Sequence, residues 1–193
     1  MHPATVALVL IVRSYDIFGV SAGNLGVAKR TAAGILRRAG IELLWVDCAA
    51  SSVSPAAPAC RDVIRADELL VRIIAAPIGD RRPTTDRDTL GHAYVDTVAR
   101  GGALATLYAD RIRVMASKSS VDEATLLGRA MAHEIGHLLL GTPTHSLQGL
   151  MRAEWSPALL QRRIGNDWQF SPGELESLAK NLELRITSPP ASP

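Results

Sequence analysis

Apolar residues along the chain fall into short blocks that predict strands separated by polar segments and helices. Four blocks are almost continuously apolar, which is typical of strands buried on both faces of a sheet. They span residues 5–12, 41–47, 69–75 and 103–108. Residues 23–39, between the first two blocks, predict a helix. The pattern therefore predicts strands and helices in mixed order along one chain.

The longest predicted helix runs from Val121 to Leu140. Ser120 and Glu123 match a capping box at its start. An apolar stripe at helical spacing supports the prediction and comprises Leu126, Leu127, Ala130, Ile135, Leu138 and Leu139. Gly141 can end the helix in a left-handed conformation, and Pro143 prevents the helix from resuming smoothly. The chain is therefore expected to reverse after Gly141.

Two further segments complete the predicted elements. Residues 109–118 fit either the end of a strand or a short helix. Near the C-terminus, Ser171 and Pro172 match a cap and a first helical position, which predicts a closing helix over residues 172–183. We expect residues 188–193 to form a disordered tail.

The predicted helix over 121–140 carries the run His133-Glu134-Ile135-Gly136-His137. Histidines four residues apart lie on one face of a helix, so both imidazoles can reach one metal ion. Glu134 lies beside them, where its carboxylate can reach a metal-bound water. After the chain reverses, His145 can return toward both histidines as a third ligand. Three protein ligands leave the fourth position of a zinc ion open for water. This is the His-Glu-x-x-His arrangement of zinc-dependent peptidases.

These residues could instead be ordinary side chains of a helical protein with another function. An isolated histidine on an apolar helix is usually such a residue. Here, however, three of the chain's 5 histidines lie within residues 133–145, beside a glutamate in an otherwise apolar helix. A buried carboxylate and two buried imidazoles are costly unless a metal or a proton network satisfies them. The metal interpretation is therefore favoured.

The motif resembles that of the metzincin clan of zinc endopeptidases. The clan's pattern is His-Glu-x-x-His-x-x-Gly-x-x-His, followed by a tight turn with a methionine beneath the metal. His133, Glu134 and His137 match this pattern directly. Residues 149–151 (Gly-Leu-Met) resemble the methionine turn. The resemblance implies that Met151 forms an apolar floor under the metal and acts structurally.

The chain departs from the clan's pattern after the second histidine. Gly141 comes one residue late and His145 two residues late. One extra helical residue rotates the exit of the helix by about 100°, and the longer loop must undo that rotation. The third ligand is therefore either His145 or, as in gluzincins, a later glutamate, Glu154 or Glu174. His145 is favoured because Met151 follows it within six residues.

The resemblance also implies a fold. It is an α/β (α+β) zincin-type catalytic domain, in which a twisted mixed sheet has an antiparallel edge strand, a backing helix, an active-site helix and a C-terminal helix. The predicted elements follow this order over residues 4–155. Leu90 to Tyr94 resembles the edge strand that pairs with an extended substrate. His92, Ala93 and Tyr94 are therefore candidate substrate-binding residues.

Length and charge limit the domain organisation and the possible partners. A chain of 193 residues fits a single domain, which we place at 1–187 with an upper subdomain over 1–140 and a lower one over 141–187. The 21 Lys and Arg residues are nearly balanced by 19 acidic residues, so no nucleic-acid partner is expected. The apolar run over 6–12 is too short to span a membrane. We expect a monomer with a peptide or protein substrate and no membrane partner.

Cys48 and Cys60 stand at the two ends of a loop rich in Ala, Ser and Pro. In a peptidase-like domain this placement suggests a disulfide, worth about 3 kcal/mol for a loop of this size. The alternative is two free thiols in a cytosolic protein. The chain has neither the charged start nor the small-residue cleavage site of a secretion signal. We nevertheless expect a secreted or extracytoplasmic protein.

Together these features predict a zinc-dependent metalloendopeptidase. His133, His137 and His145 would bind zinc as neutral imidazoles, and Glu134 would act as general base on the metal-bound water. A non-catalytic zinc-binding domain is the remaining alternative. Glu134 argues against it, because a purely structural zinc site has no need of a base.

Overall fold

The computed structural model describes residues 8–48, 60–77, 89–162 and 165–187. The predicted tail over 188–193 lies outside these ranges. The strands and helices, in chain order, are β1 (Leu8–Asp16), α1 (Ala22–Arg38), β2 (Ile41–Asp47), β3 (Glu68–Ile74), β4 (Gly91–Asp96), β5 (Gly101–Tyr108), α2 (Ala109–Ser119), α3 (Glu123–Leu140), α4 (Pro157–Leu160), the 3-10 helix η3 (Gly165–Trp168) and α5 (Pro172–Thr187).

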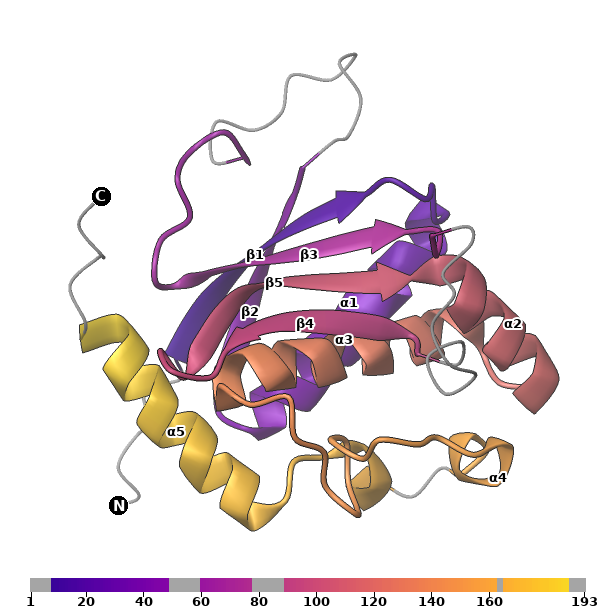
Figure 1. Cartoon of the computed structure of the whole chain (residues 1–193). Helices are drawn as coiled ribbons and strands as arrows, with labels where there is room; N and C mark the ends of the chain where they lie inside the picture. Colours follow the sequence, from indigo (N-terminus) through magenta and orange to yellow (C-terminus); the bar gives the residue numbers. More distant parts are fainter. Residues whose placement is uncertain (1–7, 49–59, 78–88, 163–164, 188–193) are drawn as a thin grey trace, which may run out of the picture.

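The five strands form one mixed sheet in the order β2-β1-β3-β5-β4 (Figure 1). Residues 8–12 of the first apolar block lie in β1, and residues 5–7 lie outside the described ranges. The other three blocks form β2, β3 and β5, and each of these four strands runs parallel to its neighbours in that set. The edge strand β4 is antiparallel to β5, with Gly91 opposite Leu107 and Ala93 opposite Ala105. The predicted mixed sheet with an antiparallel edge strand is therefore confirmed.

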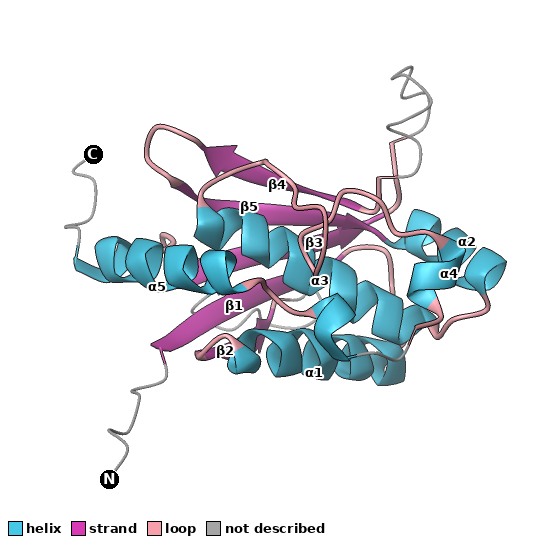
Figure 2. Cartoon of the chain, turned by 90° about the horizontal axis from the view of Figure 1, so that it is seen from below, coloured by secondary structure: helices cyan, strands magenta, loops and turns pink. Residues whose placement is uncertain are grey.

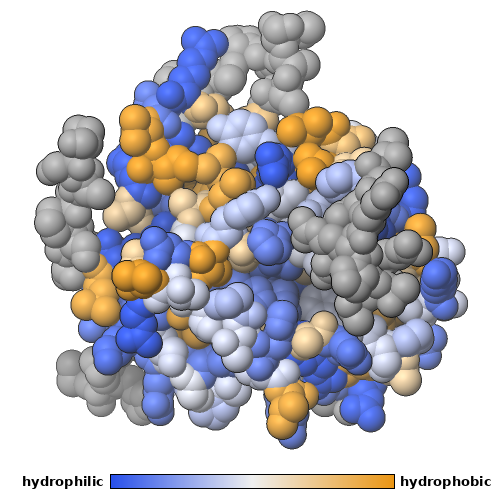
Figure 3. All heavy atoms as spheres, in the orientation of Figure 1, coloured by the Kyte–Doolittle hydropathy of each residue, from blue (hydrophilic) through white to orange (hydrophobic). Residues whose placement is uncertain are grey.

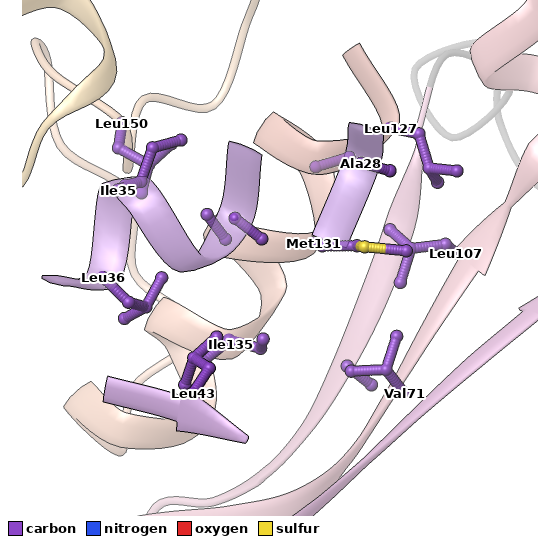
Figure 4. Close-up of a cluster of buried hydrophobic side chains, with 14 of the residues drawn as sticks. Ala28, Ile35, Leu36, Leu43, Val71, Leu107, Leu127, Met131, Ile135 and Leu150 are labelled. Atoms are coloured by element: carbon purple, nitrogen blue, oxygen red, sulfur yellow. The ribbon is translucent and has the colours of Figure 1, made fainter. Parts of the chain in front are cut away.

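Helices α1 and α3 lie side by side against one face of the sheet (Figure 2). Figure 4 shows where their apolar side chains meet each other and the strands. Ile35 and Leu36 of α1, and Met131 and Ile135 of α3, are at most 5% exposed. Burial of a large apolar side chain contributes about 1.5–3 kcal/mol, so this packing fixes α3 firmly against the sheet.

The start of α3 differs from the sequence prediction. Its N-cap is Asp122, whose carboxylate accepts a hydrogen bond from the backbone N–H of Thr125 at 2.7 Å. The predicted capping box of Ser120 and Glu123 is wrong, because Ser120 ends α2 in a left-handed conformation with φ 52°. Residues 109–118 are helical, and two helices this close along the chain need Ser120 for the turn between them.

The chain beyond α3 is mostly irregular. Gly141 ends α3 in a left-handed conformation with φ 64°, as predicted. Helices α4 and η3 lie in a stretch for which the sequence predicted no element. The predicted closing helix is α5, which continues to Thr187 and contacts α3.

Cys48 and Cys60 form the predicted disulfide, with their Cα atoms 5.7 Å apart. It joins the end of β2 to the segment that precedes β3. No helix in the described ranges is long and apolar enough to cross a membrane. On the face seen in Figure 3, apolar residues form small separate groups among hydrophilic ones, which is ordinary for the surface of a globular protein.

Candidate metal centre

Three histidine side chains converge at the C-terminal half of α3. His133 and His137 lie one turn apart on the same helix face, and the loop after Gly141 brings His145 back to them. The Nε2 atom of His137 lies 3.0 Å from that of His133 and 3.2 Å from that of His145. One nitrogen from each ring lies within 4.8 Å of the other two, so all three can bind one ion.

Backbone carbonyls fix the orientation of the two helical imidazoles. The Nδ1–H of His133 donates to the Leu150 carbonyl and that of His137 to the Thr142 carbonyl, each at 2.8 Å. A carbonyl only accepts, so each Nδ1 holds the proton and each Nε2 presents a lone pair to the centre. Two lone pairs facing each other at 3.0 Å repel unless a cation lies between them.

The donor set therefore fits zinc. Tetrahedral zinc with Zn–N distances of about 2.0–2.1 Å separates its ligand nitrogens by roughly 3.3 Å, close to the spacing of these imidazoles. Burial lowers the pKa of His133 to about 3 and the pKa of His137 to about 4. Partial burial of the imidazole also lowers the pKa of His145. All three shifts favour the neutral ring, the form in which imidazole binds metals.

Glu134 follows His133 on α3 and is 7% exposed. Burial raises the pKa of its carboxyl to about 8. The edge strand approaches this carboxylate closely, because a Cβ placed on Gly91 would lie 2.8 Å from both Cγ and Oε1 of Glu134. A buried carboxylate whose pKa lies near neutral pH is suited to accept and release a proton.

The histidines and Glu134 share a cavity of about 350 Å³. Residues of the edge strand β4, of α3 and of the segment that follows Met151 line this cavity. The lining residues outside α3 include Gly91, His92, Ala93, Tyr108, Arg111, Met115, Arg152, Ala153 and Trp155. Of the predicted substrate-binding residues, His92 and Ala93 therefore line the cavity. Tyr94 is not part of this lining and instead contacts the ring of His92, with ring centroids 4.8 Å apart.

Met151 is fully buried. A Cβ on Gly136 would lie 2.6 Å from its sulfur, so Met151 packs against the backbone of the turn between the two helical histidines. This contact requires glycine at position 136. The adjacent Leu150 supplies the carbonyl that accepts from His133. The 149–151 turn thus contacts α3 through both a side chain and a backbone group.

The two glutamates considered as alternative ligands lie outside the histidine group. Glu154 is exposed. The Glu174 carboxylate accepts hydrogen bonds from the Ser146 hydroxyl and from the backbone N–H of Ser171.

Sequence reasoning missed several groups that shape the site. Carbonyls such as those of Thr142 and Leu150 have no side-chain signature, so no residue pattern reveals them. Trp155 also escaped notice, although its ring lies perpendicular to that of His133 with centroids 5.5 Å apart. Gly91 gave a usable signal, because a glycine in a strand often marks a close approach of another group.

No protein-family model matches the chain, and no curated protein is similar enough in sequence to match it. Solved structures with the same fold do exist. A zinc-dependent peptidase from Methanocorpusculum labreanum superposes with a TM-score of 0.53 at 14% identity, over 87% of this chain and 99% of that one. Archaemetzincin from Methanopyrus kandleri superposes with a TM-score of 0.56 at 16% identity, over 95% of this chain and 99% of that one. The chain therefore has a zincin-like fold.

Proposed function

We propose that the protein is a zinc-dependent metalloendopeptidase that uses His133, His137 and His145 as ligands. The observation that carries this proposal is the convergence of three imidazoles, two of them oriented by carbonyls, in the same cavity as a buried glutamate. The two structural neighbours named as a zinc-dependent peptidase and an archaemetzincin support the same reaction class.

The proposed mechanism assigns the proton transfers to Glu134. Zinc, when bound, supplies the Lewis acidity that lowers the pKa of a coordinated water toward about 7 and polarises the peptide carbonyl. The Glu134 carboxylate accepts the proton of the attacking water and delivers it to the leaving amine nitrogen. Burial raises the pKa of this carboxyl to about 8, and zinc, when bound nearby, would favour the charged carboxylate that accepts the proton. Met151 supports the helix turn between the ligands.

The proposed substrate is an extended peptide that pairs with β4. Among the described strands β4 ends the sheet on this side, so its outer edge can accept a further strand through main-chain hydrogen bonds. Ala93 and His92 on this strand line the cavity beside the metal centre, and Tyr94 would contact the substrate beyond it. Main-chain pairing along the edge would hold residues on both sides of the scissile bond, which favours cleavage within a chain.

The disulfide supports a location outside the cytosol. Disulfides persist in oxidising compartments and are rare where thiols are kept reduced. We therefore include a secreted or extracytoplasmic location in the proposal. The redox state of Cys48 and Cys60 in protein isolated from its native compartment checks it, and free thiols there would contradict it.

The test of the reaction uses the purified chain and peptides blocked at both ends. We expect about one zinc per chain, cleavage of the blocked peptides, loss of cleavage after removal of zinc with a chelator, and recovery when zinc is returned. Blocked ends exclude exopeptidase action. A chain that binds no zinc, or a zinc-loaded chain that cleaves no peptide in a broad peptide library, would contradict the proposal.

A further inference from the structure

We infer that the C-terminal helix α5 positions the third zinc ligand, with Glu174 acting on His145 through Ser146. This inference rests on the zinc site proposed above and adds a positioning residue to it. Glu174 was considered in the sequence as a metal ligand, and its contacts assign it this different role.

The Glu174 carboxylate links the loop that carries His145 to the start of α5. Its Oε1 accepts a hydrogen bond from the hydroxyl of Ser146, the residue next to His145. Its Oε2 accepts from the backbone N–H of Ser171 at 2.6 Å, while the Ser171 hydroxyl accepts from the backbone N–H of Glu174 at 3.3 Å. The second pair of bonds is a capping box at the start of α5. One carboxylate therefore ties the start of this helix to the ligand loop.

The ligand loop needs such a tie because it has little packing of its own. His145 is exposed and lies in irregular chain between Gly141 and the 149–151 turn. The Ser146 backbone N–H donates to the Met151 carbonyl at 2.8 Å, and its hydroxyl donates to Glu174. Ser146 is thus held from two sides, which restricts where the neighbouring imidazole can lie.

A second contact from α5 holds the start of the ligand loop, at the end of α3. The side-chain amide of Asn181 donates to the Leu139 carbonyl at 3.2 Å and to the Leu140 carbonyl at 2.9 Å. These carbonyls end α3, just before the chain turns at Gly141. Asn181 lies two helical turns after Glu174, so both side chains project from one face of α5. Helix α5 therefore contacts the chain on both sides of His145, through Asn181 at the end of α3 and through Glu174 at Ser146.

Residues that orient metal ligands through such hydrogen bonds typically change metal affinity by about 10- to 100-fold when they are replaced.

The experiment measures zinc affinity by competition with a chelator of known affinity. We expect Glu174→Ala and Ser146→Ala each to weaken zinc binding by about 10- to 100-fold. Ser146→Ala leaves the capping box intact, so its effect does not depend on the folding of α5. Glu174→Gln should restore most of the affinity, because the amide oxygen can accept from Ser171 and the amide nitrogen can donate to the Ser146 hydroxyl. Glu176→Ala is the matched control, because Glu176 is an exposed residue with the same charge on the same helix. This variant should bind zinc as the unaltered chain does.

A double-mutant cycle tests whether Glu174 acts through His145. In a His145→Ala background, Glu174→Ala should cause little further loss of affinity, because the group that it positions is gone. Equal losses in both backgrounds, or unchanged affinity in Glu174→Ala or Ser146→Ala, would overturn the inference while leaving the zinc site in place. An unaltered chain without zinc affinity would overturn the zinc site and this inference together.

Discussion

The two sides of Gly141 hold the metal centre by different means. Before it, His133 and His137 lie on α3, whose Met131, Ile135 and Leu138 are fully buried. After it, the chain that carries His145 is irregular and is held by hydrogen bonds that Ser146 donates to the Met151 carbonyl and to the Glu174 carboxylate. Two of the proposed ligands thus take their positions from packing in the core, and the third takes its position from hydrogen bonds. This difference predicts how each part responds to substitution.

The largest effect should come from the packed side. His133→Ala or His137→Ala removes a buried ligand whose ring is oriented by a carbonyl. Because two remaining ligands cannot hold a tight zinc site, we expect tight zinc binding to be abolished and peptide cleavage to be lost with it. Metal analysis of the purified variants after dialysis checks this. Full zinc occupancy in either variant would show that the helical histidines are not ligands.

His145→Ala should weaken zinc binding strongly, but less than loss of a helical histidine. The loop ligand is exposed, so water can take its place at the metal, whereas the space left in α3 lies in the protein interior. The control is Glu154→Ala, because Glu154 is an exposed acidic residue in the same part of the chain. Comparing the zinc affinities of the two variants separates loss of a ligand from a general change in charge. The comparison would fail if Glu154→Ala lost zinc and His145→Ala kept it.

Gly91→Ala tests how closely the edge strand fits the proposed base. The added Cβ would lie 2.8 Å from Glu134 Oε1 and 2.9 Å from the Thr106 carbonyl oxygen, so the carboxylate must move. Misplacement of a reacting group by about 1 Å can lower a rate by roughly 100-fold. We expect slower turnover of this order with zinc content unchanged. Gly23→Ala is the control, because a Cβ there meets nothing within 4 Å. Unchanged turnover in Gly91→Ala would show that catalysis does not depend on the position of the Glu134 carboxylate beside Gly91.

The smallest effect on the site should follow loss of the disulfide. Paired Cys48→Ser and Cys60→Ser substitutions release a bridge that links residues 12 positions apart, far from the histidines in the chain. We expect the free energy of unfolding to fall by about 3 kcal/mol, with zinc affinity and turnover retained. Urea denaturation measures the first quantity. A large loss of zinc would mean that the site depends on this distant region.

The regular part of the molecule could be predicted well from sequence. The continuous apolar blocks mark the four parallel strands. Of these, β1, β3 and β5 lie inside the sheet, and β2 lies at its edge. Ile41–Asp47 is β2 with the predicted bounds. The boundary between α2 and α3 was harder to predict from the sequence, because Ser120 suits either a helix cap or a turn. The choice depends on α2, which the ambiguous residues 109–118 did not reveal.

The site divides in the same way. Spacing along a helix was sufficient to identify His133, Glu134 and His137 as candidates, because the helix itself fixes their relation. Loop geometry beyond Gly141 does not follow from spacing, so His145 competed there with Glu154 and Glu174. In the structure His145 lies beside the helical pair. The neighbouring Ser146 donates hydrogen bonds to the Met151 carbonyl and to Glu174, and a residue pattern displays neither bond.

The most direct test of the central claim compares Glu134→Ala and Glu134→Gln with the unaltered chain in zinc content and peptide turnover. If this carboxylate is the base and not a ligand, both variants should hold about one zinc per chain. Their turnover should fall by about 10²- to 10⁴-fold, since proton transfer alone is removed. Loss of zinc together with activity, or turnover equal to that of the unaltered chain, would contradict the role assigned to Glu134.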